Sequence, residues 1–297
     1  MAGSLVVVGT GLSAAAHMTL ETKALIEQSE KLLYVVADPV TGEWLESLNP
    51  TSESLYSFYD PSVDRLHTYM RMTEYIMSFV RAGKQVCAAF YGHPGVFVFP
   101  AHEAIIIAAR EGYEAELKPA ISAEDCLFAD LRIDPGRVGC QSFEATDFLI
   151  YNRRFDARSV LILWQIGVLG QIGFQKRFPI QENLEILKKH LTSEYAGNQL
   201  AYVYEASPYP VCDPLIEKIV LSELCAEHLT PISTLVIPPS EPSIPDVAMM
   251  DRLCIPRRYI QYKQDNPSEY NASSPFISPS VRRREPASGL LVAKFHH

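Results

Sequence analysis

The sequence predicts an α/β protein with two domains. Short apolar runs that end in Gly or Pro loops alternate with segments of helical spacing along the first 240 residues. Continuous Val, Leu and Ile runs are typical of parallel strands that are buried on both faces, and their alternation with helices indicates crossover connections. At 297 residues the chain is also long enough for one core to divide into two.

The N-terminal domain shows the alternation most clearly, and we place it at residues 1–119. Its expected strands are 4–8, 32–37 and 85–90, and its expected helices are 18–29, 61–82 and 101–111. In the 61–82 helix, Asp60 is the expected N-cap and Pro61 the first helical residue. On that helix Arg65, Tyr69, Met72 and Ile76 would share one face.

A break at Pro119-Ala120 separates a C-terminal domain, which we place at residues 120–240. Its expected helices are 124–131 and 181–195, and its expected strands are 160–166, 201–204 and 233–237. From residue 241 to 297 the chain becomes rich in Pro and Ser and turns basic. That composition predicts a loop-rich tail without a core of its own.

Charge and composition exclude several classes of protein. The chain has 26 Lys+Arg against 35 Asp+Glu, a formal net charge of −9, whereas its last 47 residues are net positive. An acidic body argues against nucleic-acid binding, because phosphates require a basic surface. No apolar run approaches the roughly 18 residues that a membrane span needs, the six cysteines are scattered, and no metal-ligand spacing is present. We expect a cytoplasmic protein whose basic tail contacts an acidic partner subunit.

Two glycine loops follow predicted strands. The run Gly9-Thr10-Gly11 with Ala14, and Asp38 after the second strand, matches a dinucleotide-binding fingerprint, although a tight turn needs the same small residues. The second loop is Tyr91-Gly-His-Pro-Gly-Val-Phe97. In open α/β sheets ligands bind at the carboxyl ends of strands, so this loop is a candidate ligand site.

These motifs, in order, resemble those of the tetrapyrrole-methylase superfamily. The matching runs are Gly9-Thr-Gly11, Tyr91 to Phe97, Ile121-Ser-Ala-Glu-Asp125 with the following Cys-Leu-Phe-Ala-Asp-Leu131, Phe143-Glu-Ala145, Trp164-Gln165 and Pro231 to Pro239. General members carry Gly-Asp-Pro in the 91–97 loop. A Tyr followed by Gly-His-Pro is more similar to the borosin peptide α-N-methyltransferases. The resemblance covers about residues 3–250.

The resemblance implies two α/β domains with S-adenosylmethionine in the cleft between them, and an intertwined homodimer. It also implies that the Gly9–Gly11 turn flanks the substrate and holds no dinucleotide. The implied cofactor contacts are Tyr91, Gly92, His93, Gly95, Val96, Phe97, Ser122, Ala123, Gln165, Tyr204, Ala206, Ser233 and Thr234. The implied catalytic residues are Tyr59, Arg65, Tyr69 and Tyr91. Ala120 departs from the family pattern, which usually has glycine there.

Backbone N-methylation explains why phenols and a guanidinium are needed. An amide nitrogen is a poor nucleophile, so the enzyme must orient the amide, stabilise charge on its oxygen and remove its proton. We expect Arg65 and Tyr69 to form the deprotonating or relay pair, with Arg65 favouring a phenolate or polarising the phenol. Tyr59 would be a further donor, and Tyr91 would orient the amide.

The substrate is expected to be a ribosomally made precursor peptide, and two arrangements stay open. Many fungal borosin enzymes carry the peptide in the same chain, but only about 58 residues follow Pro239 here, too few for a full clasp and core. Either a separate precursor is methylated, or the chain is a shortened fused protein or carries a short core in the apolar run 289–295. The alternatives are a methylase of a tetrapyrrole-type small molecule and a non-catalytic peptide-binding module.

Overall fold

A computed structural model describes residues 2–260 except 14, 37, 61, 172, 174–179, 242–243 and 259. The chain divides into two compact units. Unit 1 comprises Met1–Asp130, Gly170–Pro179 and Ala206–Asp213, and unit 2 comprises Leu131–Leu169, Ile180–Glu205 and Pro214–His297. We describe each unit by itself. The first segment of unit 1 extends beyond the predicted domain boundary near residue 120 and includes most of helix α5 (Ala123–Leu131). Two later segments of the chain also belong to unit 1.

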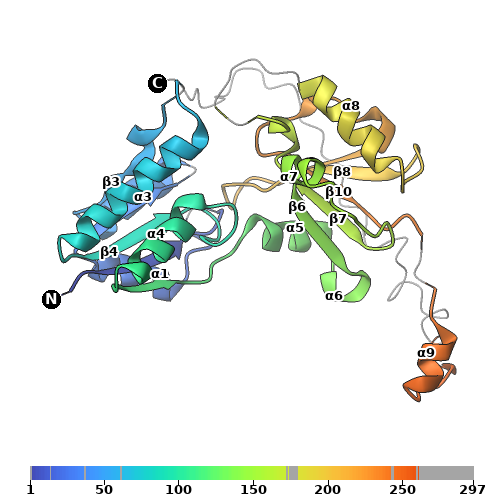
Figure 1. The fold of residues 1–297 in the computed structure, drawn as a ribbon, viewed down its shortest axis with the longest axis horizontal. Coiled ribbons are helices and arrows are strands. Elements are labelled where there is room, and N and C mark those ends of the chain that lie inside the picture. Colours follow the sequence, from blue (N-terminus) through green and yellow to red (C-terminus); the bar gives the residue numbers. More distant parts are fainter. Residues whose placement is uncertain are drawn as a thin grey trace. The chain divides into compact units, whose positions relative to one another are not determined.

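Unit 1 contains a parallel sheet with strand order β3-β2-β4-β1-β5 (Figure 1). Its strands are β1 (Ser4–Gly9), β2 (Lys31–Val35), β3 (Glu53–Ser54), β4 (Gln85–Phe90) and β5 (Glu114–Leu117). Its helices are α1 (Leu20–Gln28), α2 (Pro39–Leu48), the 3-10 helix η1 (Leu55–Phe58), α3 (Arg65–Arg81), α4 (Phe99–Arg110) and α5 (Ala123–Leu131). The predicted strand 85–90 is confirmed at both ends.

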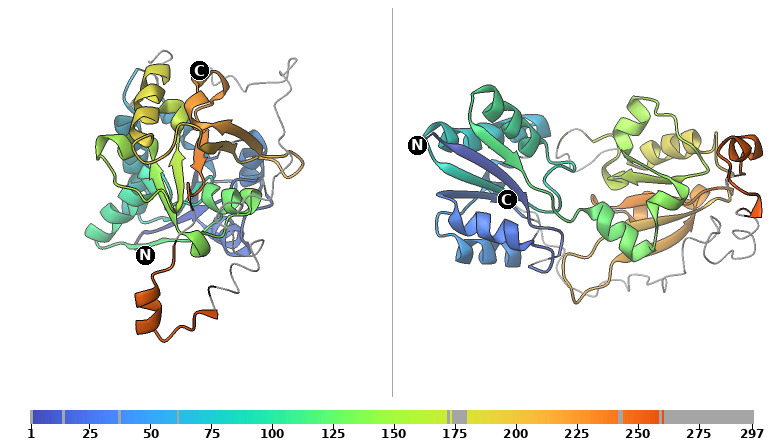
Figure 2. Two further views of the ribbon diagram at one scale, coloured as in Figure 1. Left: turned by 90° about the vertical axis from the view of Figure 1, so that its right-hand side faces the viewer. Right: turned by 90° about the horizontal axis from the view of Figure 1, so that it is seen from below.

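Alternating residues of each strand bury against different helices. Val8, Leu32 and Cys87 pack in one core with residues of α1 and α2, whereas Val7, Leu33 and Ala88 pack in another with α3 and α4. Both cores are apolar, which explains why these strands are continuous Val, Leu and Ala runs. Figure 2 shows the strands between their two helical layers.

Helix α3 starts later than the sequence predicted. Its N-cap is Asp64, whose carboxylate accepts a hydrogen bond from the His67 amide at 2.7 Å. Asp60, the predicted cap, instead accepts from the amide and the hydroxyl of Ser62 at 2.8 and 2.6 Å. Asp60 therefore closes a local turn, and the predicted start of the helix at 61 was wrong.

Unit 2 contains a mixed sheet with strand order β6-β7-β10-β8-β9. Its strands are β6 (Cys140–Glu144), β7 (Val160–Trp164), β8 (Leu200–Glu205), β9 (Leu215–Val220) and β10 (Thr234–Ile237). Only β6 and β7 are parallel. Its helices are α6 (Pro135–Val138), α7 (Ala145–Ile150), α8 (Ile180–Leu191), α9 (Val247–Arg252) and the 3-10 helices η2 (Ile166–Val168), η3 (Leu221–Glu223) and η4 (Ala226–His228).

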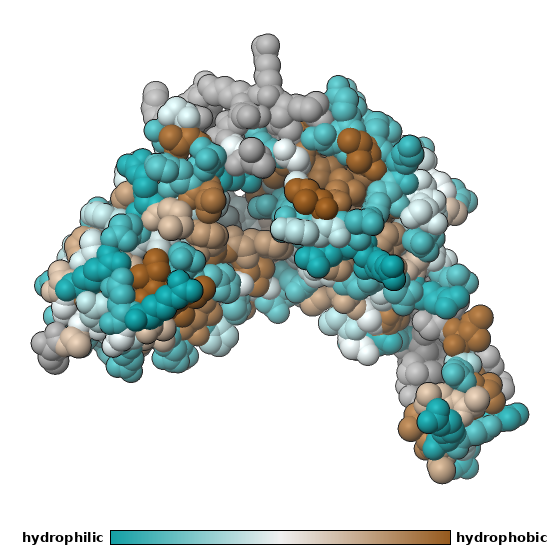
Figure 3. All heavy atoms as spheres, in the orientation of Figure 1, coloured by the Kyte–Doolittle hydropathy of each residue, from teal (hydrophilic) through white to brown (hydrophobic). Residues whose placement is uncertain are grey.

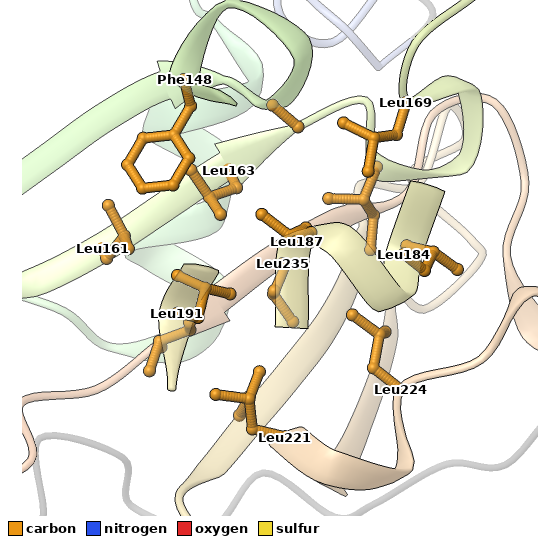
Figure 4. Packing of buried hydrophobic residues seen from close by; sticks show 14 of the residues in the cluster. Phe148, Leu161, Leu163, Leu169, Leu184, Leu187, Leu191, Leu221, Leu224 and Leu235 are labelled. Atoms are coloured by element: carbon orange, nitrogen blue, oxygen red, sulfur yellow. The ribbon is translucent and has the colours of Figure 1, made fainter. Parts of the chain in front are cut away.

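The core of unit 2 lies between α7, α8 and one face of its sheet. Phe148 of α7 and Leu184, Leu187 and Leu191 of α8 pack against Leu161, Leu163 and Leu235 of the strands (Figure 4). All of these side chains are fully buried. This packing fixes where the ends of β7, β8 and β10 lie, and several predicted site residues follow these ends.

Helix α9 has an apolar surface. Leu253 just after it is 62% exposed, and Val247 and Met249 are each more than 40% exposed. Brown, apolar side chains lie on the surface of this segment, at the lower right of Figure 3. Among the described residues, no helix is both long and apolar enough to cross a membrane.

Candidate functional site

Three tyrosines from one stretch of unit 1 form an aromatic cluster. Tyr56 lies in η1, Tyr59 directly follows it, and Tyr69 lies one turn into α3. The ring centroids of Tyr56 and Tyr59 are 5.4 Å apart, and the rings of Tyr59 and Tyr69 meet edge to face at 6.5 Å. Phe99, at the start of α4, stacks on Tyr69 at 6.2 Å. The structure therefore brings together two of the predicted catalytic residues, Tyr59 and Tyr69.

Tyr56 was not among the residues predicted from the sequence, although it places another phenol three residues before Tyr59. Its hydroxyl donates a hydrogen bond to the main-chain oxygen of Val36, just after β2, at 2.7 Å. The amide of Tyr59 donates to the carbonyl of Tyr56 at 3.0 Å. Tyr56 thereby ties the turn that carries Tyr59 to the end of the sheet.

Arg65 is the first residue of α3 and lies one helical turn before Tyr69. Its Nη2 donates a hydrogen bond to Oε1 of Gln171 at 3.1 Å, across a separation of 106 residues. Gln171 belongs to a segment of the chain that joins unit 1 late in the sequence. No local pattern predicts this contact, so sequence reasoning missed Gln171.

Burial controls the ionisation of the phenols. Desolvation raises the pKa of Tyr59 and of Tyr69 above the ordinary 10.0, even though Arg65 acts to lower both. The pKa of Tyr56 rises to about 12 for the same reason, with neighbouring Tyr91 and Asp38 adding to the shift. Tyr91 also has a raised pKa, because protein atoms desolvate its hydroxyl. All four phenols are therefore neutral at pH 7, which disfavours a phenolate on Tyr69 in this structure.

The 91–97 loop is held to the ends of two strands. The amide of Tyr91 donates to Val35 of β2 at 2.9 Å, and Gly92 and Gly11 exchange main-chain hydrogen bonds of 2.8 and 3.2 Å. Gly9 lies against the same loop, because a Cβ on Gly9 would be 2.2 Å from the oxygen of Gly92. The two glycine loops of the sequence are therefore one structure, and Gly9 is required for their close approach.

Two histidines fix the middle of that loop. Nδ1 of His93 accepts a hydrogen bond from the Gly95 amide at 2.9 Å, and Nε2 of His102 donates to the Gly95 carbonyl at 2.9 Å. Val96 and Phe97 are exposed, and Phe97 has a φ of +58°, which is unusual for a residue with a side chain. The loop therefore presents Val96 and Phe97 outward on a fixed main chain.

Asp38 does not act as the acid of a dinucleotide site. Its two carboxylate oxygens accept hydrogen bonds from the amide and the hydroxyl of Thr41, at 2.8 and 2.7 Å, and it is the N-cap of α2. This local role accounts for the side chain and removes the main support for a dinucleotide-binding site.

Ser122 and Ala123 lie at the start of α5 in unit 1. The carboxylate of Asp125 accepts hydrogen bonds from the amide and the hydroxyl of Ser122 at 2.7 and 2.6 Å, and the Asp125 amide donates back to the Ser122 hydroxyl at 3.1 Å. Ser122 is thus engaged in capping. Ala120, the departure from the family pattern, has its methyl group where a Cβ on Gly9 would need space, at 2.5 Å.

The other predicted cofactor residues lie around the carboxyl end of β7, the end of β8 and the start of β10. Gln165 directly follows β7 with a φ of +60°, Tyr204 is buried near the end of β8, and Thr234 begins β10. The hydroxyl of Ser233 is buried inside unit 2 and donates to Glu205 at 2.6 Å. Ala206 follows β8 but belongs to unit 1. The predicted set is therefore divided between the two units.

Few side-chain atoms pack against the main chain at Gly92. Gly92 is buried and has a φ of +69°, yet a Cβ built on it would meet only Leu12 within 4 Å, at 3.6 Å. The main chain is therefore open on this side for a close approach. Val96 and Phe97 beside it are exposed and apolar.

Comparison with known proteins defines the class. The family described as Tetrapyrrole (Corrin/Porphyrin) Methylases matches residues 4–207, so the chain belongs to that family. Its fold is similar to the crystal structure of uroporphyrin-III-C-methyltransferase from Thermus thermophilus, with a TM-score of 0.57, 18% identity and coverage of 86% of this chain and 98% of that one. The methyltransferase CobJ gives a TM-score of 0.54 at 17% identity, covering 79% and 93%.

Curated relatives place the chain on the borosin branch of this family, and these relatives are named as methyltransferases joined to cyclic peptide precursors. The type I borosin cyclic peptide precursor of Coprinopsis marcescibilis is 42% identical, over 82% of this chain and 63% of the relative. The omphalotin A precursor of Omphalotus olearius is 37% identical, over 99% of this chain and 71% of the relative. This chain spans about three-fifths of the length of several such relatives.

Proposed function

We propose that the chain transfers methyl groups from S-adenosylmethionine to backbone amides of a ribosomally made precursor peptide. The observation that carries this proposal is the cluster of Tyr59, Tyr69 and Arg65, next to the loop that begins at Tyr91. The relatives are named as methyltransferases joined to cyclic peptide precursors, which supports a peptide substrate. S-adenosylmethionine supplies an electrophilic methyl group.

The cofactor would be held by the 91–97 loop, by Ser122, Ala123 and Ala206 of unit 1, and by Gln165, Tyr204, Ser233 and Thr234 of unit 2. The hydroxyls and the amides of Ser122 and Ser233 already donate hydrogen bonds inside the protein, so these two residues would contact the cofactor without donating to it. Gly92 would let the cofactor approach the main chain, and the exposed side chains of Val96 and Phe97 would supply apolar contacts. The protein is a cytoplasmic homodimer in this proposal.

The phenols act in the neutral form. Burial keeps Tyr69 protonated, so its hydroxyl donates to the amide oxygen as negative charge develops there, and the Arg65 guanidinium stabilises that charge. The amide proton passes along the hydroxyls of Tyr69 and Tyr59 to solvent water, which accepts it, and both phenols end in the neutral form. Tyr91 holds the amide in line for transfer.

The test compares Tyr69→Phe and Arg65→Ala with Tyr75→Phe. Tyr75 lies on the same helix, but its hydroxyl donates to Glu53 at 2.6 Å. Mass spectrometry should show loss of N-methylation by at least a hundredfold in the first two variants and wild-type methylation in the third. Calorimetry should show unchanged S-adenosylmethionine affinity in all three. Full methylation by both Tyr69→Phe and Arg65→Ala would refute the assignment.

The same measurement decides where the substrate lies. Intact mass and fragmentation of the purified chain would locate methyl groups in residues 289–295 if the peptide is carried in cis. An unmodified chain that methylates an added Val/Ile-rich peptide would establish transfer to a separate precursor.

A further inference from the structure

Glu205 is a buried acid that neither the sequence motifs nor the proposed mechanism uses. Among the described residues two carboxylates are buried, those of Asp38 and Glu205, and Asp38 caps a helix. Glu205 is 6% exposed and is the last residue of β8. A buried carboxylate is costly unless hydrogen bonds compensate for its lost hydration, so its partners show what it does.

Two of those partners are hydroxyls of one turn. Oε1 of Glu205 accepts from Oγ of Ser233 at 2.6 Å and from Oγ1 of Thr230 at 2.7 Å. The turn closes on itself, because the Thr230 amide donates to Oγ of Ser233 at 2.8 Å and the Ser233 amide donates to the Thr230 carbonyl at 3.0 Å. Glu205 therefore ties the end of β8 to the turn that enters β10.

The same turn also contacts the residues that follow β7. The amide of Ile166 donates to the Ser233 carbonyl at 3.0 Å. Gly167 lies so close to the turn that a Cβ there would be 1.9 Å from the oxygen of Thr230. Gln165, directly before Ile166, has a left-handed main chain with φ of +60°. The ends of β7 and β8 and the start of β10 are thus connected through Thr230 and Ser233.

We propose that Glu205 is a positioning residue for the proposed cofactor contacts of unit 2. By holding the Thr230–Ser233 turn, it fixes Ser233, Thr234 and, through Ile166, Gln165. This inference rests on the proposed function for the identity of the ligand. Hydroxyl donors to a buried carboxylate form short, strong hydrogen bonds, which suits a residue that must hold three chain segments in place.

A matched control exists at the other end of the same sheet. The Gln141 side chain donates to the Asp156 carbonyl at 3.0 Å and to the Ser159 hydroxyl at 2.7 Å, and accepts from the Asp156 amide at 3.0 Å. Ser159 directly precedes β7, whereas Gln165 directly follows it. Gln141→Ala therefore removes a hydrogen-bond network from unit 2 at the end of β7 opposite the site.

The experiment measures binding of S-adenosylmethionine and S-adenosylhomocysteine by calorimetry, and amide exchange at Ile166, in the full chain. Glu205→Ala should weaken both ligands about tenfold, and should expose the Ile166 amide to exchange. Glu205→Gln keeps the accepting oxygen and should bind within about twofold of wild type. Thr230→Val removes one donor and should lie between them. Gln141→Ala should lower thermal stability with ligand affinity and Ile166 protection unchanged.

Wild-type affinity in Glu205→Ala, or equal loss in Glu205→Gln and Glu205→Ala, would overturn the positioning role. If Glu205→Ala does not fold, Thr230→Val takes its place. Weaker ligand binding in Thr230→Val than in Glu205→Gln and Gln141→Ala would then support the positioning role, and equal binding in all three would overturn it. The exchange measurement needs no ligand. If wild-type protein binds neither ligand, the proposed function fails, while Ile166 exchange in the variants still decides whether Glu205 fixes the turn.

Discussion

Replacing Gly9 with alanine tests whether the two glycine loops form one packed structure. Gly9 ends β1, and a Cβ there would lie 2.2 Å from the Gly92 oxygen, 2.5 Å from the Ala120 Cβ and 2.7 Å from the Pro94 Cδ. A main-chain oxygen, a methyl group and a proline ring have no rotamer by which to move away. The 91–97 loop must therefore shift as a whole.

Overpacking of this kind costs about 1–3 kcal/mol and occasionally more. Because all three contacts are with rigid neighbours, we expect Gly9→Ala to lower the free energy of unfolding by about 3 kcal/mol. That loss corresponds to a fall of roughly 6–12 °C in Tm for a unit of 150–250 residues. Urea unfolding followed by circular dichroism measures it, and amide exchange at Gly11 and Gly92 reports the displaced loop.

Two further variants make the test specific. Gly42 lies inside α2, and a Cβ there would have no neighbour closer than 3.7 Å, so Gly42→Ala should be neutral or stabilise by up to about 1 kcal/mol through helix propensity. Ala120→Gly in the Gly9→Ala background removes one of the three clashes and should recover part of the loss. Wild-type stability and loop protection in Gly9→Ala would refute the reasoning.

Three other predictions concern unit 1. Asp64→Ala should destabilise α3 by about 1 kcal/mol in urea unfolding, whereas Asp60→Ala, outside the helix, should cost less; the reverse order would contradict the observed cap. Gln171→Ala removes the acceptor that holds Arg65, so kcat for methyl transfer should fall about fivefold to tenfold with cofactor affinity unchanged, and an unchanged kcat would exclude this role. Hydrogen bonds from Lys31 and Tyr75 lower the pKa of Glu53 below its ordinary 4.5, so its stabilising effect is present above pH 4.5 and is lost as the pH falls through its folded-state pKa. The stability difference between wild type and Glu53→Gln should therefore shrink on acidification from pH 7 to pH 3, and a constant difference would contradict the assignment.

The sequence predicted the central strands of both sheets because their apolar runs are a local property. β4 was predicted at both ends, and β1, β7 and β8 within about two residues at either end. It did not predict the edge strands β3, β5, β6 and β9, which carry polar residues such as Glu114 and Glu116 and lack an apolar run. Edge strands are paired on one side only and need no continuous apolar sequence.

The candidate site was also predicted only in part from the sequence. The spacing on α3 predicted that Arg65 lies one turn before Tyr69, and the structure adds Tyr59 and Phe99 around Tyr69. The sequence did not predict that Asp64 is the N-cap of α3. Asp60 and Asp64 are both acceptable caps, and the hydrogen bonds between Asp60 and Ser62 in the folded chain decide between them.

By itself, the sequence determined the strand and helix types, the loops at the carboxyl ends of the strands and the family, since these depend on local periodicity and motif order. Only the tertiary structure decided which groups meet across the chain. It placed Gln171 on Arg65, buried Glu205 between Thr230 and Ser233, and raised the pKa of Tyr69 despite the nearby guanidinium. Long-range contacts and desolvation depend on how the elements pack, and no local pattern of residues encodes that packing.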